Sequence, residues 1–157
     1  MRRLTMTTLA LLAAVPALAQ LPNPYGQSVN LENARRIAAA AAAEAGKNNL
    51  KMAIAIVDTA GDLVYFEKMD GTQAASIDIA IAKARSAARF KRPTRALQDA
   101  LAAGGEGLRI LGLQGAVPVE GGVPIVVDGK MVGAIGASGG TSVQDGQTAK
   151  AGADSVK

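Results

Sequence analysis

The stretch VPIVVDGKMVGAIGASGG, residues 123–140, gives the clearest indication of the fold. Two β-rich runs, VPIVV and MVGAIGA, flank the dipeptide Asp128-Gly129, and an Asp-Gly pair between apolar runs is the strongest short signal for a β-hairpin. A second pair of β-rich runs, at 51–58 and 63–69, is joined by the turn TAGD, in which Gly61 permits a positive φ. The sequence therefore predicts two antiparallel hairpins.

One helical pattern precedes the hairpin of residues 51–69, and another follows it. The alanine-rich run LENARRIAAAAAAEAG (31–46) follows Asn30, which stands in an N-cap position, and Gly46 closes it. The run SIDIAIAKARSAARF (76–90) has apolar residues at helical spacing, and Pro93 stops it. Both runs are therefore expected to be helices that cover the sheet.

The second half of the chain continues this order. Thr94 is expected to begin the short helix TRALQDALA, and the glycine-rich segment 104–122 predicts a loop with a turn of helix or a short strand. Ser142 and Asp145 have capping-box spacing before a last helix. The order of helix, hairpin, helices, hairpin and helix lacks the strand-helix alternation of a parallel sheet, so the expected class is α+β with an antiparallel sheet.

The first residues have the features of an export signal. MRRLTMTTLALLAAVPALAQ (1–20) has a positive start, an apolar run and the small-x-small motif ALA at 17–19. The apolar run is shorter than the ~20 residues of a membrane span. We therefore expect a signal peptide over 1–19, a leader over 20–29 and one domain over 30–157. The mature chain is expected in the periplasm or outside the cell, with no membrane insertion after cleavage.

Composition excludes several kinds of chemistry. The chain has no cysteine and no histidine, so it offers no disulfide, no thiolate, no Cys-ligated zinc and no imidazole ligand. Loss of Arg2 and Arg3 with the signal leaves 15 basic against 13 acidic side chains, a net charge of +2. This weak charge, with aromatics at 3%, gives no reason to expect a nucleic-acid partner. The Arg2-Arg3 pair leaves the Sec and twin-arginine routes both open.

The stretch GASGG (136–140) reads as G-x-S-x-G, the setting in which a hydrolase presents its serine. A serine needs a base to take its proton, and the usual base is histidine, which this chain lacks. Lys130 and Lys150 are the only lysines within a dozen residues, and neither forms an S-x-x-K motif with Ser138. We interpret GASGG as a structural turn, predict no catalytic residue and no metal site, and favour a protein that is not an enzyme.

An ordered set of short motifs runs through most of the chain. V-D-x-x-G, D-G, K-A-R, P-T, G-G-x-P, D-G, G-A-I-G-x-S-G and D-x-x-x-A follow one another between residues 30 and 153. This set resembles the haem-binding/GlcG-like family, which includes secreted haem-binding proteins and the C-terminal domain of some corrinoid adenosyltransferases. The resemblance implies a two-layer α+β domain, PAS/profilin-like, and we expect an antiparallel sheet of about five strands covered by helices. It also implies homo-oligomers, from dimers to octamers, and haem or another tetrapyrrole as cofactor.

The resemblance points to individual ligand-binding residues. Lys83 and Arg85 match the K-A-R motif, where cations can bind haem propionates, although a solvated or subunit-facing stripe is the alternative. Thr94 matches the P-T position near the ligand, with a plain helix N-cap as the alternative. Gly121 and Gly122 match G-G-x-P.

The glycine loop supplies the remaining candidates, Ser138 and Gly139. Successive amides that feed a helix N-terminus form a small concavity for an anion, such as a carboxylate or propionate. Close packing of the backbone is the alternative explanation for these glycines. Asp145 is expected to be a capping carboxylate.

The favoured function is an exported, oligomeric small-ligand-binding protein, with haem or another tetrapyrrole as ligand and haem storage, degradation or redox sensing as its role. The alternative is an accessory protein or enzyme of small oxidised-carbon (glycolate-type) metabolism, and a third reading is an oligomeric scaffold without ligand. Because imidazole and thiolate are absent, any haem iron is expected to take oxygen, Met or Lys ligation and to be largely high-spin.

Overall fold

The computed structural model describes residues 22–156, so the predicted signal peptide lies outside the described residues. No helix in this described range is long and apolar enough to cross a membrane. The elements in chain order are α1 (Leu31–Lys47), β1 (Ala53–Val57), β2 (Leu63–Lys68), α2 (Ser76–Phe90), α3 (Thr94–Ala102), η1 (Gly105–Gly112), β3 (Gly122–Val127), β4 (Lys130–Ser138) and α4 (Ser142–Ala153).

The two predicted hairpins form one antiparallel sheet with the strand order β2-β1-β4-β3. Asp128 and Gly129 both have positive φ, at 49° and 71°, as the favoured two-residue turn of a hairpin requires. The central strands β1 and β4 join the hairpins, with Ile56 opposite Ile135. Strand β3 is an edge, and Pro124 lies in it because a proline is tolerated only where the sheet ends or bulges.

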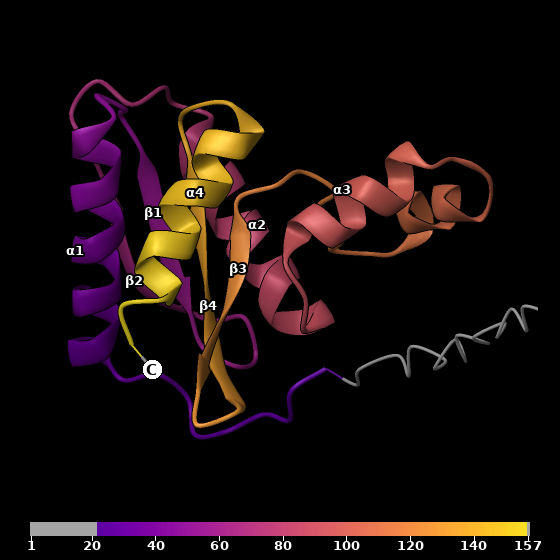
Figure 1. Ribbon diagram of the computed structural model, residues 1–157, viewed down its shortest axis with the longest axis horizontal. Coiled ribbons are helices and arrows are strands. Elements are labelled where there is room, and N and C mark those ends of the chain that lie inside the picture. The colour runs from indigo at the N-terminus through magenta and orange to yellow at the C-terminus, as the bar shows by residue number, and fades with distance from the viewer. Residues whose placement is uncertain (1–21, 157) are drawn as a thin grey trace, which may run out of the picture.

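Helices cover both faces of this sheet (Figure 1). Helices α1 and α4 pack on one face, where alanines such as Ala38 and Ala41 are fully buried against Ile54 and Ile135. Helix α2 packs on the opposite face against alanines of the central strands. Small side chains allow these close helix-sheet contacts, so the apolar cores lie on both sides of the sheet.

The α+β class with an antiparallel sheet and helices is confirmed, with two differences in detail. The sheet has four strands in the described range instead of about five, because the segment after α3 forms the 3-10 helix η1 and a loop. Helices on both faces also make three layers instead of two. Helix α3 and η1 form an arm that projects from the sheet (Figure 1) and exposes Leu108 and Leu111.

Helix starts were predicted with mixed success. Asn30 caps α1 as expected, since its side chain accepts a hydrogen bond from the Asn33 amide at 2.9 Å. The capping box of α4 is formed by Thr141 and Gln144, so the expected pair of Ser142 and Asp145 is wrong by one residue. This shift frees the carboxylate of Asp145 for contacts outside its own helix.

The leader ahead of α1 lies against the sheet. The amide of Gly26 donates to the carbonyl oxygen of Met131 at 2.8 Å, and the amide of Met131 donates to that of Pro24 at 2.8 Å. The amide of Val29 donates to the carbonyl oxygen of Val132 at 2.7 Å. These bonds fill the edge of β4 where it extends beyond β1, so the described part of the leader is integral to the domain.

Candidate functional site

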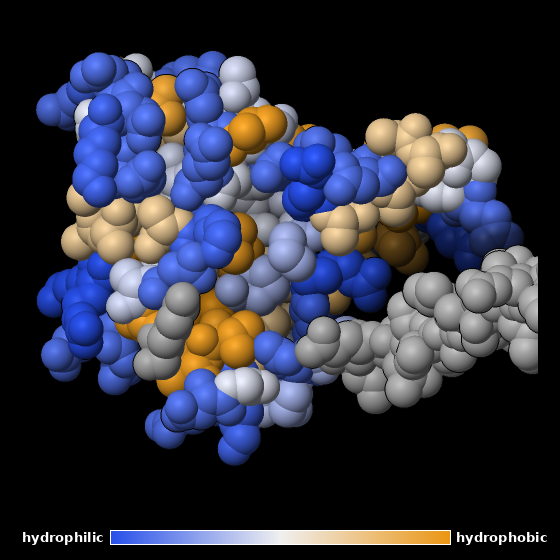
Figure 2. Space-filling model, viewed as in Figure 1, coloured by the Kyte–Doolittle hydropathy of each residue, from blue (hydrophilic) through white to orange (hydrophobic). Residues whose placement is uncertain are grey.

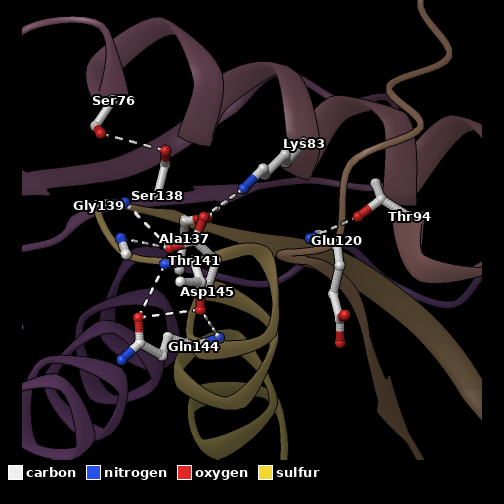
Figure 3. Close-up of polar contacts among 12 residues, drawn as sticks. Ser76, Lys83, Thr94, Glu120, Ala137, Ser138, Gly139, Thr141, Gln144 and Asp145 are labelled. Atoms are coloured by element: carbon white, nitrogen blue, oxygen red, sulfur yellow. Dashed lines mark hydrogen bonds and ion pairs between the residues drawn. The ribbon is translucent and has the colours of Figure 1, made fainter. Parts of the chain in front are cut away.

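A buried ion pair connects the helices on opposite faces of the sheet (Figure 3). The ammonium of Lys83 on α2 lies 2.6 Å from Oδ2 of Asp145 on α4, and it also donates to the Ala137 carbonyl oxygen at 3.2 Å. The side chains of Lys83 and Asp145 are only 1% and 5% exposed. Charges this far from water persist only when they are paired, so this pair fixes the end of the sheet.

The glycine loop at the end of β4 already binds a carboxylate of its own chain. Oδ1 of Asp145 accepts hydrogen bonds from the amides of Gly139 and Gly140, at 3.1 and 2.9 Å. The concavity predicted for an anion therefore exists, and Asp145 lies in it. A Cβ on Gly139 would overlap the Lys51 carbonyl oxygen, so close backbone packing explains that glycine.

The hydroxyl groups near this loop are buried in pairs or against backbone. The hydroxyl of Ser138 lies 3.2 Å from that of Ser76, and Ser138 is buried (Figure 3). Thr94 follows the N-cap residue Pro93, so the N-cap interpretation of Thr94 is wrong. Its hydroxyl accepts a hydrogen bond from the Gly122 amide at 2.9 Å, which fixes the start of β3.

Gly121 lies directly against the ion pair. It has a φ of +130°, and a Cβ at this position would lie 2.7 Å from Nζ of Lys83. A Cβ on Gly122 would lie 2.7 Å from Cγ2 of Thr94. These close approaches explain why the turn into β3 requires two successive glycines.

The structure brings six of the seven predicted ligand-binding residues to this end of the sheet. Arg85 is the exception, because its Nε donates to the Gly61 carbonyl oxygen in the β1–β2 turn at 3.1 Å. The others meet at the start of β3 and the end of β4: Lys83, Thr94, Gly121, Gly122, Ser138 and Gly139.

A cavity of about 600 Å³ opens beside this cluster, between β3, α4 and the start of α3. Its volume lies within the roughly 300–1,000 Å³ typical of ligand pockets. Gly121 and Gly122 line it, whereas Lys83 and Thr94 lie behind these glycines. Figure 2 shows apolar surface over the β3–β4 hairpin near the C-terminus. The apolar wall of the cavity consists of Pro93, Val123, Pro124, Val126, Ala153 and Val156.

Paired charges surround this apolar wall. The guanidinium of Arg95 lies 2.7 Å from the carboxylate of Asp99 and 3.1 Å from that of Glu120. Hydrogen bonds to these carboxylates, with the larger effect from Asp99, raise the pKa of Arg95 above its ordinary value. Lys150 forms an ion pair with Asp154. Sequence reasoning missed these cavity residues because no motif contains them and they come from three separate elements.

The described residues contain no group of three or more His, Asp or Glu side chains arranged to hold a metal ion. An apolar wall with charges at its margin is suited to an organic ligand that carries both apolar and ionic groups.

Fold and cavity together define a small α+β protein with a ligand-sized pocket beside the edge strand of a four-stranded antiparallel sheet. The family model described as "Haem degrading protein HbpS-like" matches residues 29–154. The chain belongs to the HbpS-like family, as its motifs indicated.

Similar proteins come from several bacteria. Protein GlcG of Escherichia coli K12 is 40% identical over 105 residues, which cover 67% of this chain and 77% of that protein. An uncharacterised 15.0 kDa protein of Citrobacter freundii, from the dhaT-dhaS intergenic region, is 33% identical over 120 residues, covering 75% of this chain and 84% of that protein. A crystal structure of an HbpS variant from Streptomyces reticuli has a TM-score of 0.77 at 28% identity, and the match covers 97% of this chain and 99% of that one.

Proposed function

We propose that this protein is an exported homo-oligomer that binds haem or another tetrapyrrole in the cavity beside β3. The observation that carries the proposal is the apolar cavity of about 600 Å³ with cations at its margin, in a chain of the HbpS-like family. A tetrapyrrole has a large apolar ring with carboxylates on one side, so an apolar wall with nearby cations suits it. Storage, degradation and redox sensing are all roles that such binding supports.

The residues present fit haem in a defined way. Val123, Val126 and Val156 offer apolar contact to the ring, and the cations Arg95 and Lys150 can donate charge-assisted hydrogen bonds to the propionates. Both cations are paired with carboxylates of the chain, so a propionate competes with Glu120 or Asp154 for them. This competition predicts modest affinity.

The iron of a bound haem would find only weak ligands in this cavity. The sequence has no histidine or cysteine, so the ligating side chains that line the cavity are carboxylates and one amine. When bound, haem would supply the redox chemistry of its iron, while the chain supplies binding and orientation. Oxygen ligation predicts a largely high-spin ferric spectrum. The carboxylates and the amine that could ligate the iron in this cavity are Glu120, Asp128, Lys150 and Asp154.

A haemin titration tests this placement. Val126→Trp introduces a large side chain into the cavity, and Val143→Trp makes the same change at a residue that is 53% exposed on α4 and does not line the cavity. The wild type and Val143→Trp should show the same saturable Soret change. Val126→Trp should bind at least tenfold more weakly, a loss of about 1.4 kcal/mol. Equal binding by both variants would place haem elsewhere, and no saturable change in the wild type would remove haem as the ligand.

The charged margin has its own test. Arg95→Gln should weaken haemin binding several-fold, because it removes a candidate propionate donor. Arg109→Gln is the matched control, since Arg109 forms an exposed pair with Glu106 and does not line this cavity. Equal affinity in the two variants would contradict a role for Arg95.

Export and assembly are further parts of the proposal. The motif at 17–19 supports cleavage before Gln20, and the intact mass of exported protein tests it. Exposed Leu108 and Leu111 on the projecting arm, together with the edge strand β3, support self-association. Light scattering at micromolar concentration should give a multiple of the chain mass, and a clean monomer would contradict this part.

A further inference from the structure

A second cavity, of about 320 Å³, lies on the α2 side of the sheet and shares no lining residue with the cavity beside β3. It is formed where α2, the start of β2 and the loop after η1 meet. The amide of Val117 donates to the hydroxyl of Ser86 at 3.0 Å, which holds this loop against α2. The lining residues are Leu63, Asp78, Ile81, Ala82, Arg85, Arg89, Gly115 and Val117.

Two arginines of this cavity are held by the β1–β2 turn. Arg85 and Arg89 are one helical turn apart on α2 and therefore share a face. Nε of Arg85 donates to the Gly61 carbonyl oxygen at 3.1 Å, and Nε of Arg89 donates to that of Ala60 at 3.0 Å. Among the residues that the structure describes, the two terminal nitrogens of each guanidinium have no hydrogen-bond partner, so they can bind other acceptors.

The turn that anchors them is itself held together by hydrogen bonds. Oδ1 of Asp58 accepts hydrogen bonds from three successive amides, those of Ala60, Gly61 and Asp62, each at 2.9 Å. A Cβ on Gly61, whose φ is +93°, would lie 3.0 Å from Nε of Arg89. The glycine thus lets the arginine pack on the turn, and the position of its guanidinium is set before any ligand arrives.

The two guanidinium groups have no acidic partner within the described range. Neither Arg85 nor Arg89 forms an ion pair with any carboxylate of residues 22–156, although other surface arginines such as Arg95 and Arg109 do. Asp78 lines the cavity without reaching either arginine. Two cations of like charge on one helix face repel each other, and an anion that contacts both would relieve this repulsion.

From this arrangement we propose that the second cavity binds a small organic carboxylate with a short apolar body. A carboxylate matches the fork of a guanidinium, which binds it through two parallel hydrogen bonds. Leu63, Ile81 and Val117 then contact the apolar part of the ligand, a contact that inorganic phosphate cannot use. The site is independent of the haem proposal because the two cavities are separate.

Calorimetric titration of the mature protein with hexanoate and, separately, with inorganic phosphate tests the site. We expect saturable hexanoate binding that is stronger than phosphate binding. Arg89→Gln should weaken hexanoate binding at least tenfold. Arg92→Gln is the charge-matched control, because Arg92 is exposed just beyond α2 and does not line this cavity, and it should bind hexanoate as the wild type does.

Absence of saturable hexanoate binding would overturn the proposal, and so would equal affinity in Arg89→Gln and Arg92→Gln. Phosphate binding as strong as that of hexanoate would also overturn it, since the apolar wall would then contribute nothing. If Arg89→Gln does not fold, Arg89→Lys keeps the charge and loses the fork, and it should still bind more weakly than the wild type. Haemin titration of the same variants should be unchanged, which separates this site from the haem cavity.

Discussion

Replacement of Lys83 by methionine removes one half of the buried ion pair and nearly preserves the volume of the side chain. Asp145 then keeps its two amide donors from the glycine loop but loses the ammonium 2.6 Å away. Removal of one partner of a buried pair typically costs about 3–5 kcal/mol, because an uncompensated charge stays buried. Since domains of this size are stable by about 5–15 kcal/mol, Lys83→Met should remove a large share of the free energy of unfolding.

The pairing itself is measured by a double-mutant cycle. Asp145→Asn should also cost about 3–5 kcal/mol, while the double variant Lys83→Met/Asp145→Asn should lose about 1–3 kcal/mol less than the sum of the single losses. Urea unfolding at one fixed protein concentration gives these free energies. Lys47→Met is the matched control, because Lys47 is 73% exposed in its pair with Glu44, and it should cost less than about 1 kcal/mol.

Two outcomes would contradict a stabilising buried pair of Lys83 and Asp145. A loss for Lys83→Met as small as that for Lys47→Met would mean that water reaches the pair and screens it. Additive losses in the double variant would mean that Lys83 and Asp145 do not interact. Either result would mean that the pair of Lys83 and Asp145 does not fix the end of the sheet.

Other predictions concern packing and titration. A Cβ on Gly136 would overlap the Ala80 carbonyl oxygen of α2, so Gly136→Ala should cost at least about 1–3 kcal/mol in urea unfolding, whereas Gly46→Ala, with open space at its Cβ, should be neutral or stabilising. A hydrogen bond with Glu67 raises the pKa of Tyr65 above its ordinary value, with smaller contributions from burial and from the Glu67 charge. Spectrophotometric titration should therefore show one tyrosine that ionises at a higher pH than an ordinary tyrosine. Glu67→Gln should lower the pKa of this tyrosine. An unchanged titration in that variant would contradict the assigned cause.

The hairpins were predictable because their signals are local. The positive φ values at Asp128 and Gly129 belong to adjacent residues, and their chemistry alone indicates the turn. The Asn30 cap is local for the same reason. The segment after α3 has no such signal, so its 3-10 helix was expected only as a turn of helix or a short strand.

The site was less accessible to sequence reasoning because its contacts are long-range. Asp145 has capping-box spacing to Ser142, yet its carboxylate contacts Lys83, 62 positions earlier in the chain. The local spacing thus predicted a helix cap, whereas in the folded chain the carboxylate of Asp145 forms an ion pair with a residue distant in sequence. Only the family resemblance pointed to Thr94, as a ligand-binding residue, and no spacing rule predicts the hydrogen bond between its hydroxyl and the Gly122 amide.

Native mass spectrometry of the protein, purified from its own cells, is the sharpest test of the proposed haem-binding oligomer because it reports the ligand and the number of subunits together. If the chain is cleaved before Gln20 as proposed, we expect a multiple of the resulting 138-residue chain, with added mass equal to a tetrapyrrole that is released on denaturation. A ligand-free monomer, both before and after incubation with haemin, would contradict it.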